Sequence, residues 1–402
     1  MSMFGLFSKK KPSLRAVIDV GSHSIKAMLF SKEGSSPPRI LKKMVLKLPL
    51  VHDEKRVVVK LRELLFTMVR QLERVPEEIT VGLGSNITHP AVRVLGIRPP
   101  GKVKNISRKD LGSYFQTLLL QNRDQERAVL AYPLNILING YAVRLEKDGA
   151  WRWLSDGSAA DVKRPGDNLL RLPSVEDLSY RTLMLYFSDD VGQALEEMKM
   201  SLGGMPITFM PLILAEYHAI GRVLGLHDFL MVDVGGEGTY LGFVKGGELV
   251  GVSSFPLGGR HFLRGIAKIT SLSFPEAEDV RRQYIQGMVS EAKKNQLREY
   301  LRTESQLWSS LYMGAIESFY HLGPLPETIL LFGGGANLPE IMSFLRDPAW
   351  SKDYTYVSAP ALKLLDASEF FEGDTLGGFL RGPEEVGLAS LMTYSLHHES
   401  LW

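Results

Sequence analysis

The pattern of apolar residues predicts two similar β-hairpins, one near the start of the chain and one past its middle. Residues 16–21 read A-V-I-D-V-G, and residues 230–236 read L-M-V-D-V-G-G. In each copy an apolar run reaches an Asp and a Gly two residues later, and a second apolar run follows, at 25–30 and at 240–244. Apolar runs on both sides of a Gly-rich turn favour a hairpin. Two such hairpins, 214 residues apart, indicate a duplicated fold whose halves face one another across a cleft.

The first hairpin is followed by elements typical of an α/β half. A strand at 39–48 precedes a helix at 53–73, whose apolar residues recur at the spacing of one helical face. A strand at 79–83 comes next. A later helix at 189–202 ends at a glycine pair and Pro206.

Residues 86–187 interrupt this half and predict a small α+β subdomain. An extended segment at 92–97 precedes a helix opened by Ser107, with Asp110 three residues on, which is a capping-box pattern. Two strands close the subdomain, at 128–138 and 181–187.

The segment at 144–179 is too long for a plain hairpin loop. This length predicts a functional or mobile loop. Trp151 and Trp153 alternate as they do on a strand, which predicts one face of a sheet. A partner-binding loop is the alternative interpretation of this pair.

The second half begins at about residue 229. It contains a helix at 275–284 with acidic residues in its first turn, a long helix at 290–320 and a strand at 328–332. The predicted domains are a basic tail at 1–12, a first half at 13–85 plus 188–228, the inserted subdomain at 86–187 and a second half at 229–402.

Composition excludes several classes of site and partner. The 402 residues include 47 Lys and Arg, 45 Asp and Glu and no Cys, with a formal net charge of +2. Disulfides, thiolate zinc sites and Cys nucleophiles are therefore excluded. The balanced charge argues against a nucleic-acid binder. The histidines show no metal-ligand spacing, which favours solvated or core roles for His23, His52, His89, His218, His227, His261, His397 and His398.

The start of the chain places an apolar group beside a lysine cluster. Phe4, Leu6 and Phe7 precede Lys9, Lys10 and Lys11. No apolar run of bilayer length and no signal peptide is predicted. We expect a cytoplasmic protein with peripheral contact at the inner face of the cytoplasmic membrane, and a solvated tail is the alternative.

Three glycine-rich turns follow three apolar strands, at 19–22, 233–236 and 332–335. Glycine lets backbone N–H groups approach phosphate oxygens closely, although each turn taken alone is more often a tight hairpin. Ser22 and Lys26 offer a hydroxyl and an ammonium to phosphate oxygens. Asp19 and Asp233 end matching strands, where paired carboxylates can hold Mg²⁺ through water.

These turns carry a family resemblance. The motifs D-V-G-S-H-S-I-K at 19–26, D-V-G-G-E-G-T-Y at 233–240, P-L-G-G-R-H at 256–261 and L-L-F-G-G-G-A-N-L-P at 330–339 resemble the phosphate-1, phosphate-2 and adenosine motifs of the actin-like ATPase superfamily. The chain is most similar to the FtsA and PilM group of bacterial proteins. The resemblance implies a duplicated actin-like (ribonuclease H-like) α/β fold with an SHS2-like subdomain inserted in the first half.

The resemblance also implies ATP and Mg²⁺ as cofactors. The segment F-P-E-A-E-D-V-R-R at 274–282 resembles the family's helix at the nucleoside. This resemblance would place Glu278 at the ribose and Arg281 at the adenine. The implied nucleotide-binding residues are Asp19, Gly21, Ser22, Lys26, Asp233, Gly235, Gly236, Gly238, Thr239, Gly258, Gly259, Glu278, Arg281, Gly333, Gly334, Gly335 and Ala336, with Asp19 and Asp233 as the Mg²⁺ sites.

The sequence departs from the family at positions that bear on hydrolysis. Glu237 stands at the third Gly of the phosphate-2 pattern, where it would repel a triphosphate or point into solvent. Met210 stands where the superfamily often has a Glu before the Pro, so the attacking water has no obvious orienting group. We expect Glu216, on the following helix, to be a solvated surface charge, with a substitute role as the alternative. Nucleotide binding with weak or no hydrolysis is therefore predicted, and the catalytic residues stay unknown.

Two scaffold functions fit the resemblance. The segments at 105–111 and 127–141 resemble the FtsA insertion, and FtsA-type proteins tether a tubulin-like division protein to the membrane and can polymerise. The opening M-S-M-F-G-L-F-S-K-K-K resembles PilM proteins, which bind a short cytoplasmic tail of a pilus membrane protein. The end S-L-H-H-E-S-L-W lacks the amphipathic helix common in FtsA.

We favour the FtsA-type division scaffold, with the PilM-type pilus scaffold as the alternative. An active ATPase or phosphotransferase of the superfamily, and a member that has lost nucleotide, are further alternatives.

Overall fold

The computed structural model describes residues 12–34, 36–48, 54–70, 75–84, 87–99, 106, 108–121, 128–145, 151–153, 175–202, 205–371 and 378–397. Several predictions lie outside these residues. They concern the basic tail up to residue 11, the Ser107 cap, the glycine pair at 203–204, most of the loop at 144–179, His52 and His398.

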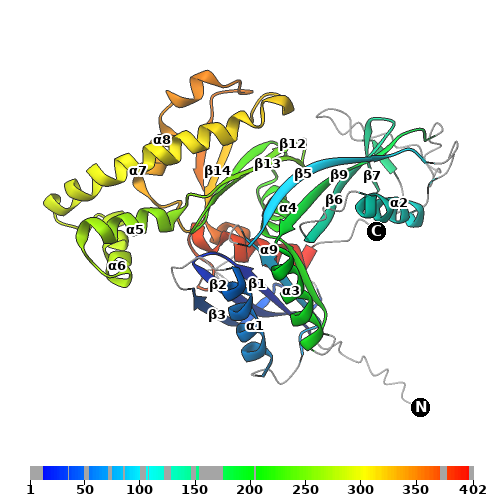
Figure 1. Cartoon of the computed structure of the whole chain (residues 1–402), viewed down its shortest axis with the longest axis horizontal. Helices are drawn as coiled ribbons and strands as arrows, with labels where there is room; N and C mark the ends of the chain where they lie inside the picture. Colours follow the sequence, from blue (N-terminus) through cyan, green and yellow to red (C-terminus); the bar gives the residue numbers. More distant parts are fainter. Residues whose placement is uncertain are drawn as a thin grey trace, which may run out of the picture.

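Two five-stranded sheets share one topology (Figure 1). The first has the order β10-β4-β1-β2-β3, and its strands are β1 (Ser13–Val20), β2 (Ser24–Lys32), β3 (Arg39–Lys47), β4 (Glu78–Leu83) and β10 (Ile207–Pro211). The second has the order β15-β14-β11-β12-β13, and its strands are β11 (Phe229–Val234), β12 (Thr239–Lys245), β13 (Glu248–Phe255), β14 (Thr328–Phe332) and β15 (Ala361–Leu364). In both, three antiparallel strands are extended by two parallel ones.

The duplication extends to an irregularity in the register. The ladder of β2 with β3 shifts between Leu29 and Phe30, and the ladder of β12 with β13 shifts between Phe243 and Val244. These are equivalent positions of the two hairpins. The mixed α/β architecture predicted from the paired hairpins is therefore confirmed.

Helices lie on both faces of each sheet. The helices α1 (Glu54–Arg70) and α3 (Asp189–Ser201) share an apolar core with the first sheet, and α5 (Gly259–Thr270), α7 (Glu291–Glu317) and α8 (Pro339–Arg346) share another with the second. The helix α6 (Phe274–Ile285) packs on α5. Short 3-10 turns η1 (Tyr320–Leu322), η2 (Trp350–Asp353), η3 (Ala367–Phe370) and η4 (Pro383–Glu385) complete the second half.

Two helices lie between the sheets. The core around α4 (Leu212–Leu224) and α9 (Val386–His397) contains Val17 and Met28 of the first sheet and Met231 and Phe332 of the second. The helix α9, which the predicted domain division places with the second half, contacts β1, β4 and α4. The residue boundaries of the domains remain a proposal.

The inserted segment forms a third sheet with the order β5-β9-β6-β7-β8, and its elements are β5 (His89–Ile97), α2 (Arg108–Gln121), β6 (Ala128–Ile138), β7 (Tyr141–Leu145), β8 (Trp151–Trp153) and β9 (Leu178–Phe187). Sequence reasoning missed β7. Its signal is Asn139-Gly140, whose φ angles of 50° and 84° suit a tight hairpin turn. The alternating tryptophans do lie on a strand, β8.

The third sheet packs against the second half along β5 and β13 (Figure 1). The Arg181 guanidinium and the Asn135 amide both donate to the carboxylate of Glu248 on β13, the former at 2.7 Å. The inserted segment therefore connects both halves of the molecule.

Candidate functional site

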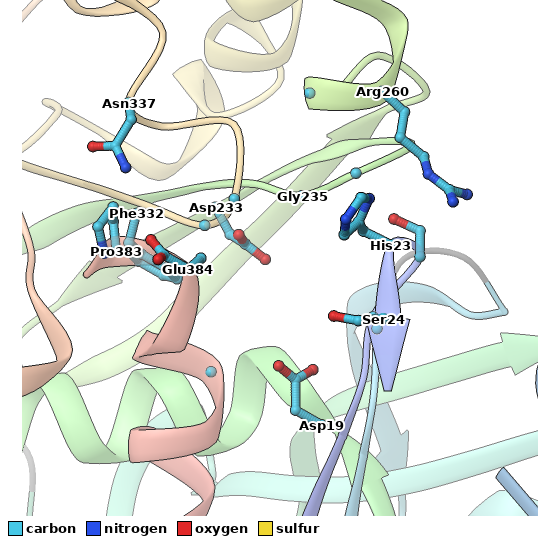
Figure 2. A pocket seen from close by; sticks show the side chains of 18 of the residues that line it. Asp19, His23, Ser24, Asp233, Gly235, Arg260, Phe332, Asn337, Pro383 and Glu384 are labelled. Carbon is cyan, nitrogen blue, oxygen red and sulfur yellow. The ribbon is translucent and has the colours of Figure 1, made fainter. Parts of the chain in front are cut away.

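A cavity of about 500 Å³ opens between the two halves. Its walls come from the β1–β2 turn, the β11–β12 turn, the loop after β14, the start of α5, one side of α6 and η4. Figure 2 shows Asp19 and Asp233 reaching towards one another from opposite halves. This volume is in the range of ligand pockets.

The hairpin register places the first charged pair. Asp19 and Lys26 face each other across the β1–β2 ladder, and the Lys26 ammonium lies 3.5 Å from Asp19 Oδ2. The ammonium also donates to the backbone carbonyl of Glu384. Lys26 is thus held at the inner end of the cavity by the first hairpin and by η4.

Asp19 keeps one oxygen free. The residue is 6% exposed, and Oδ1 has no hydrogen-bond partner in the described part of the chain. Burial raises the pKa of Asp19, and this effect outweighs the Lys26 charge. Burial lowers the pKa of Lys26, but the charges of Asp19 and Glu385 outweigh it, so this pKa lies above its usual value.

Glu216 corrects an expectation. It is not a solvated surface charge, because it is 2% exposed and lines the cavity beside Asp19 and Asp233. Burial first, then the charges of Asp233 and Asp19, raise the pKa of Glu216 well above its usual value. Burial and the charge of Asp19 raise the pKa of Asp233 to about 7. Three acidic groups, Asp19, Glu216 and Asp233, therefore lie close enough together to raise one another's pKa.

The β1–β2 turn and the β11–β12 turn contact one another. Ser22 Oγ accepts a hydrogen bond of 2.9 Å from the backbone N–H of Glu237. A Cβ at Gly236 would lie 2.5 Å from Ser22 Oγ, so this contact needs a glycine. The Glu237 carboxylate points neither at a triphosphate nor into solvent, because it pairs with Arg260 at 3.4 Å and with Arg264 at 3.0 Å.

The opposite end of the cavity is formed by α6 and the loop after β14. Arg281 donates to Glu278 Oε1 at 2.7 Å, while Glu278 Oε2 and Arg281 Nε are buried without partners in the described part of the chain. Asn337, from the loop after β14, points into the same space (Figure 2). Carboxylate, guanidinium and amide groups here can bind the hydroxyl and ring nitrogen atoms of a polar ligand.

The structure brings most of the predicted residues together. Those that line the cavity are Asp19, Gly21, Ser22, Lys26, Asp233, Gly235, Gly236, Gly259, Glu278, Arg281, Gly333 and Gly334.

Five predicted residues lie behind the cavity wall: Gly238, Thr239, Gly258, Gly335 and Ala336. Thr239 is fully buried and donates to the Leu257 carbonyl at 2.7 Å. A Cβ at Gly258 would lie 2.5 Å from the Gly235 carbonyl oxygen. These residues support the turns that line the cavity.

Among the cavity residues that sequence reasoning missed are the polar side chains of His23, Arg260, Asn337 and Glu384. The first three lie inside or beside the quoted motifs, so their positions could have suggested them. Burial lowers the pKa of His23, and the nearby charges of Arg260 and Arg281 act in the same direction. Glu384 has no local signal, because only the tertiary fold brings η4 to Lys26.

A metal ion in this cavity would need ligands beyond the side chains that the structure describes. The described residues contain no group of three or more His, Asp or Glu side chains that could hold a metal ion by themselves. Mg²⁺ usually keeps several waters and binds one or two carboxylates plus phosphates.

No helix in the described ranges is long and apolar enough to cross a membrane.

Comparisons with known proteins bear on the fold. No family model and no curated protein matches the chain. Among solved structures, a chain of the PilM-PilN type IV pilus biogenesis complex matches with a TM-score of 0.56 and 17% identity, covering 94% of this chain and 97% of that one.

Two further structures match more weakly over nearly their whole length. The MamK double helical filament has a TM-score of 0.46 and 10% identity, covering 96% of this chain and 100% of that one. MreB5 of Spiroplasma citri bound to ADP has a TM-score of 0.43 and 11% identity, covering 96% of both. The duplicated sheets, the helices between them and the likeness to the pilus complex together show that this chain has the actin-like ATPase fold.

Proposed function

We propose that the chain is an ATP-binding scaffold of the PilM type, which binds Mg-ATP between its halves and organises a type IV pilus assembly at the inner face of the cytoplasmic membrane. The observation that carries the nucleotide binding is a set of buried polar atoms that have no hydrogen-bond partner among the described residues. Asp19 Oδ1 lies at one end of the cavity, and Glu278 Oε2 and Arg281 Nε lie at the other. Such atoms are costly unless a ligand satisfies them.

The residues present fit Mg-ATP. Lys26, Ser22 and the glycine turns at 235–236 and 333–334 would hold the phosphates. Asp19 and Asp233 would hold the cation through water. Glu278 and Arg281 would bind the ribose and the adenine. When bound, Mg²⁺ supplies positive charge beside the phosphate oxygens.

The chain's own contacts hold two of the groups that would bind phosphate in place. Lys26 is fastened to Asp19 and to the Glu384 carbonyl, and Ser22 is bonded to the backbone of Glu237. The Ser22 hydroxyl accepts in this bond and keeps its proton, and the Lys26 ammonium has three N–H donors, so both can still donate to phosphate. We expect slow phosphate release because Met210 stands where the superfamily often has a Glu that orients the attacking water.

Nucleotide binding is tested by titrating purified protein with a fluorescent ATP analogue, with and without Mg²⁺. The Glu278→Gln protein should bind at least about 10-fold more weakly, because a hydrogen bond to a charged group is lost. Glu196→Gln, on the exposed face of α3, is the matched control and should bind like wild type. Absence of saturable binding by wild type would overturn the proposal.

The pilus partner rests on the likeness in fold over nearly the full length of both chains. Its test is mild cross-linking in the protein's own cells, followed by affinity purification and mass spectrometry. Recovery of a single-span pilus protein with a short cytoplasmic tail is expected. Recovery of a tubulin-like division protein instead would replace the pilus role with the FtsA-type scaffold that the sequence favours.

A further inference from the structure

Glu216 is a carboxylate that the fold buries on the cavity wall without an ion-pair partner. It lies on α4, between the two sheets, and is 2% exposed. In the described part of the chain no Lys, Arg or His forms an ion pair with it, whereas Asp19 has Lys26 and Glu237 has two arginines. A buried acidic group without a cation is costly for stability, and such groups gather at functional sites.

The surroundings of Glu216 leave room for its carboxylate at the inner end of the cavity. In the first turn of α9 a Cβ on Gly387 would lie 3.5 Å from Glu216 Oε1 and 3.3 Å from Asp19 Oδ2. The two carboxylates thus share one glycine-lined corner. Asp19, whose buried Oδ1 has no hydrogen-bond partner within the described ranges, faces the same cavity (Figure 2).

A second, much smaller cavity adjoins this corner. Its volume is about 10 Å³, and it shares Gly84, Leu212, Glu216 and Asp233 with the large cavity. A space of this size is close to that of one water molecule, and Glu216, Asp233 and Thr88 supply polar groups at its wall. Glu216 therefore lies where a water-sized space meets the ligand cavity.

We propose that Glu216 orients the attacking water for slow hydrolysis of the bound nucleotide. This inference rests on the proposed nucleotide binding, with the phosphates at the Lys26 end of the cavity. The water oxygen forms a bond to the terminal phosphorus as the bond from that phosphorus to the bridging oxygen breaks, and its electron pair leaves with the diphosphate. One water proton stays on the released phosphate and the other passes to solvent.

Glu216 acts here as a hydrogen-bond partner of the reacting water and does not bind the nucleotide. Its removal should therefore change the rate and leave affinity unchanged. Water-orienting and general-base groups contribute about 100-fold or more to a rate.

The experiment is a single-turnover assay with protein in excess over radiolabelled Mg-ATP. Glu216→Gln, which keeps the shape of the side chain, should release phosphate at least about 100-fold more slowly than wild type. Its affinity for a fluorescent ATP analogue should stay within about 2-fold of wild type. Bound nucleotide extracted after one wild-type half-life should be mainly ATP in the variant. Glu216→Asp, which keeps the carboxyl group on a shorter side chain, should be intermediate.

Glu196→Gln on α3 makes the same chemical change at an exposed site and should match wild type in rate and affinity. An unchanged rate in Glu216→Gln, or a wild type that binds ATP without any hydrolysis, overturns the inference while nucleotide binding stands. A folded Glu216→Gln protein that no longer binds ATP also overturns it, because the residue then holds the ligand. A wild type that binds no nucleotide removes the proposed function itself.

Discussion

At Gly333 the backbone has a φ of 93°, and a Cβ there would lie 2.1 Å from Asp233 Oδ1. The strand β14 therefore ends in a turn that only glycine fits, directly against a cavity carboxylate. Its neighbour Gly334 has no such constraint, because the nearest atom to a Cβ there is Glu384 Cβ at 4.0 Å.

Gly333→Ala should lower the free energy of unfolding by about 2 to 3 kcal/mol, because it adds backbone strain and displaces Asp233. Gly334→Ala, the matched control, should change it by less than about 0.5 kcal/mol. Urea titration followed by circular dichroism measures both. Equal effects of the two substitutions would contradict the role given to the turn at Gly333.

Asp366 joins η3 to the segment before α9. Its carboxylate accepts from the backbone N–H of Ser368 at 2.8 Å and from that of Gly382 at 2.9 Å. Partial burial acts to raise the pKa of Asp366, but these hydrogen bonds outweigh it and hold the pKa below its usual value.

The depressed pKa of Asp366 predicts a pH-dependent contribution to stability. This contribution should be present above the unfolded-state pKa of about 3.9 and be lost as the pH falls through the lower folded-state pKa. The difference in unfolding free energy between wild type and Asp366→Asn should therefore shrink from pH 6 to pH 3. A difference that stays constant over this range would refute the assignment.

At the residue scale, the cavity glycines could be predicted from sequence because turn residues carry local signals. The prediction that Glu216 is a solvated surface charge was wrong, because α4 is apolar around most of its surface and lies between two sheets. A charge within a helix that is apolar on all sides is the signal that was missed.

At the scale of elements, the crossing of α5 and α7 depends on one small residue. A Cβ on Gly265 would lie 2.1 Å from the Tyr300 ring. Gly314, farther along α7, is exposed, and a Cβ there meets no atom within 4 Å.

Gly265→Ala should lower the free energy of unfolding by about 1 to 3 kcal/mol, because the helices must move apart or Tyr300 must leave its place. The loss should shrink in a Tyr300→Ala background. Gly314→Ala should stabilise the protein by about 0.5 to 1 kcal/mol, since alanine favours the helix. Urea unfolding of wild type, Gly265→Ala, Tyr300→Ala, the double variant and Gly314→Ala tests this. Destabilisation by Gly314→Ala would show that α7 has contacts beyond those described.

Most elements of both halves were predictable because apolar periodicity and glycine turns are local features. The hairpin β6–β7 was not predicted although Asn139-Gly140 signals it, because the sequence analysis took the whole segment between β6 and β9 to be a single loop. The end of α7 and the start of β9 lie a few residues from the predicted positions, because the ends of helices and strands carry weak local signals.

At the scale of the whole molecule, the third sheet is joined to the second half by charge. Arg181 lies 2.7 Å from Glu248, and the side chains are 22% and 14% exposed. The pair Lys60–Glu63 on α1 is equally short, at 2.6 Å, but its side chains are 40% and 53% exposed.

Glu248→Gln should lower the free energy of unfolding by about 1 to 2 kcal/mol, because Arg181 loses a charged partner in a partly buried place. Glu63→Gln should cost less than about 0.5 kcal/mol, since water screens exposed pairs. A double-mutant cycle with Arg181→Met isolates the coupling. A coupling no larger than that of the α1 pair would show that other contacts hold the third sheet in place.

The sequence by itself determined the duplicated hairpins, the glycine turns and the motif residues that line the cavity, because these depend on local periodicity and on turn chemistry. Only the tertiary structure decided that α9 lies between the sheets, that the Glu384 carbonyl holds Lys26 and that Glu216 is buried beside Asp19 and Asp233. Those contacts join residues far apart in the chain, and no pattern of neighbouring residues encodes them. Burial and charge at the cavity are properties of the assembled halves.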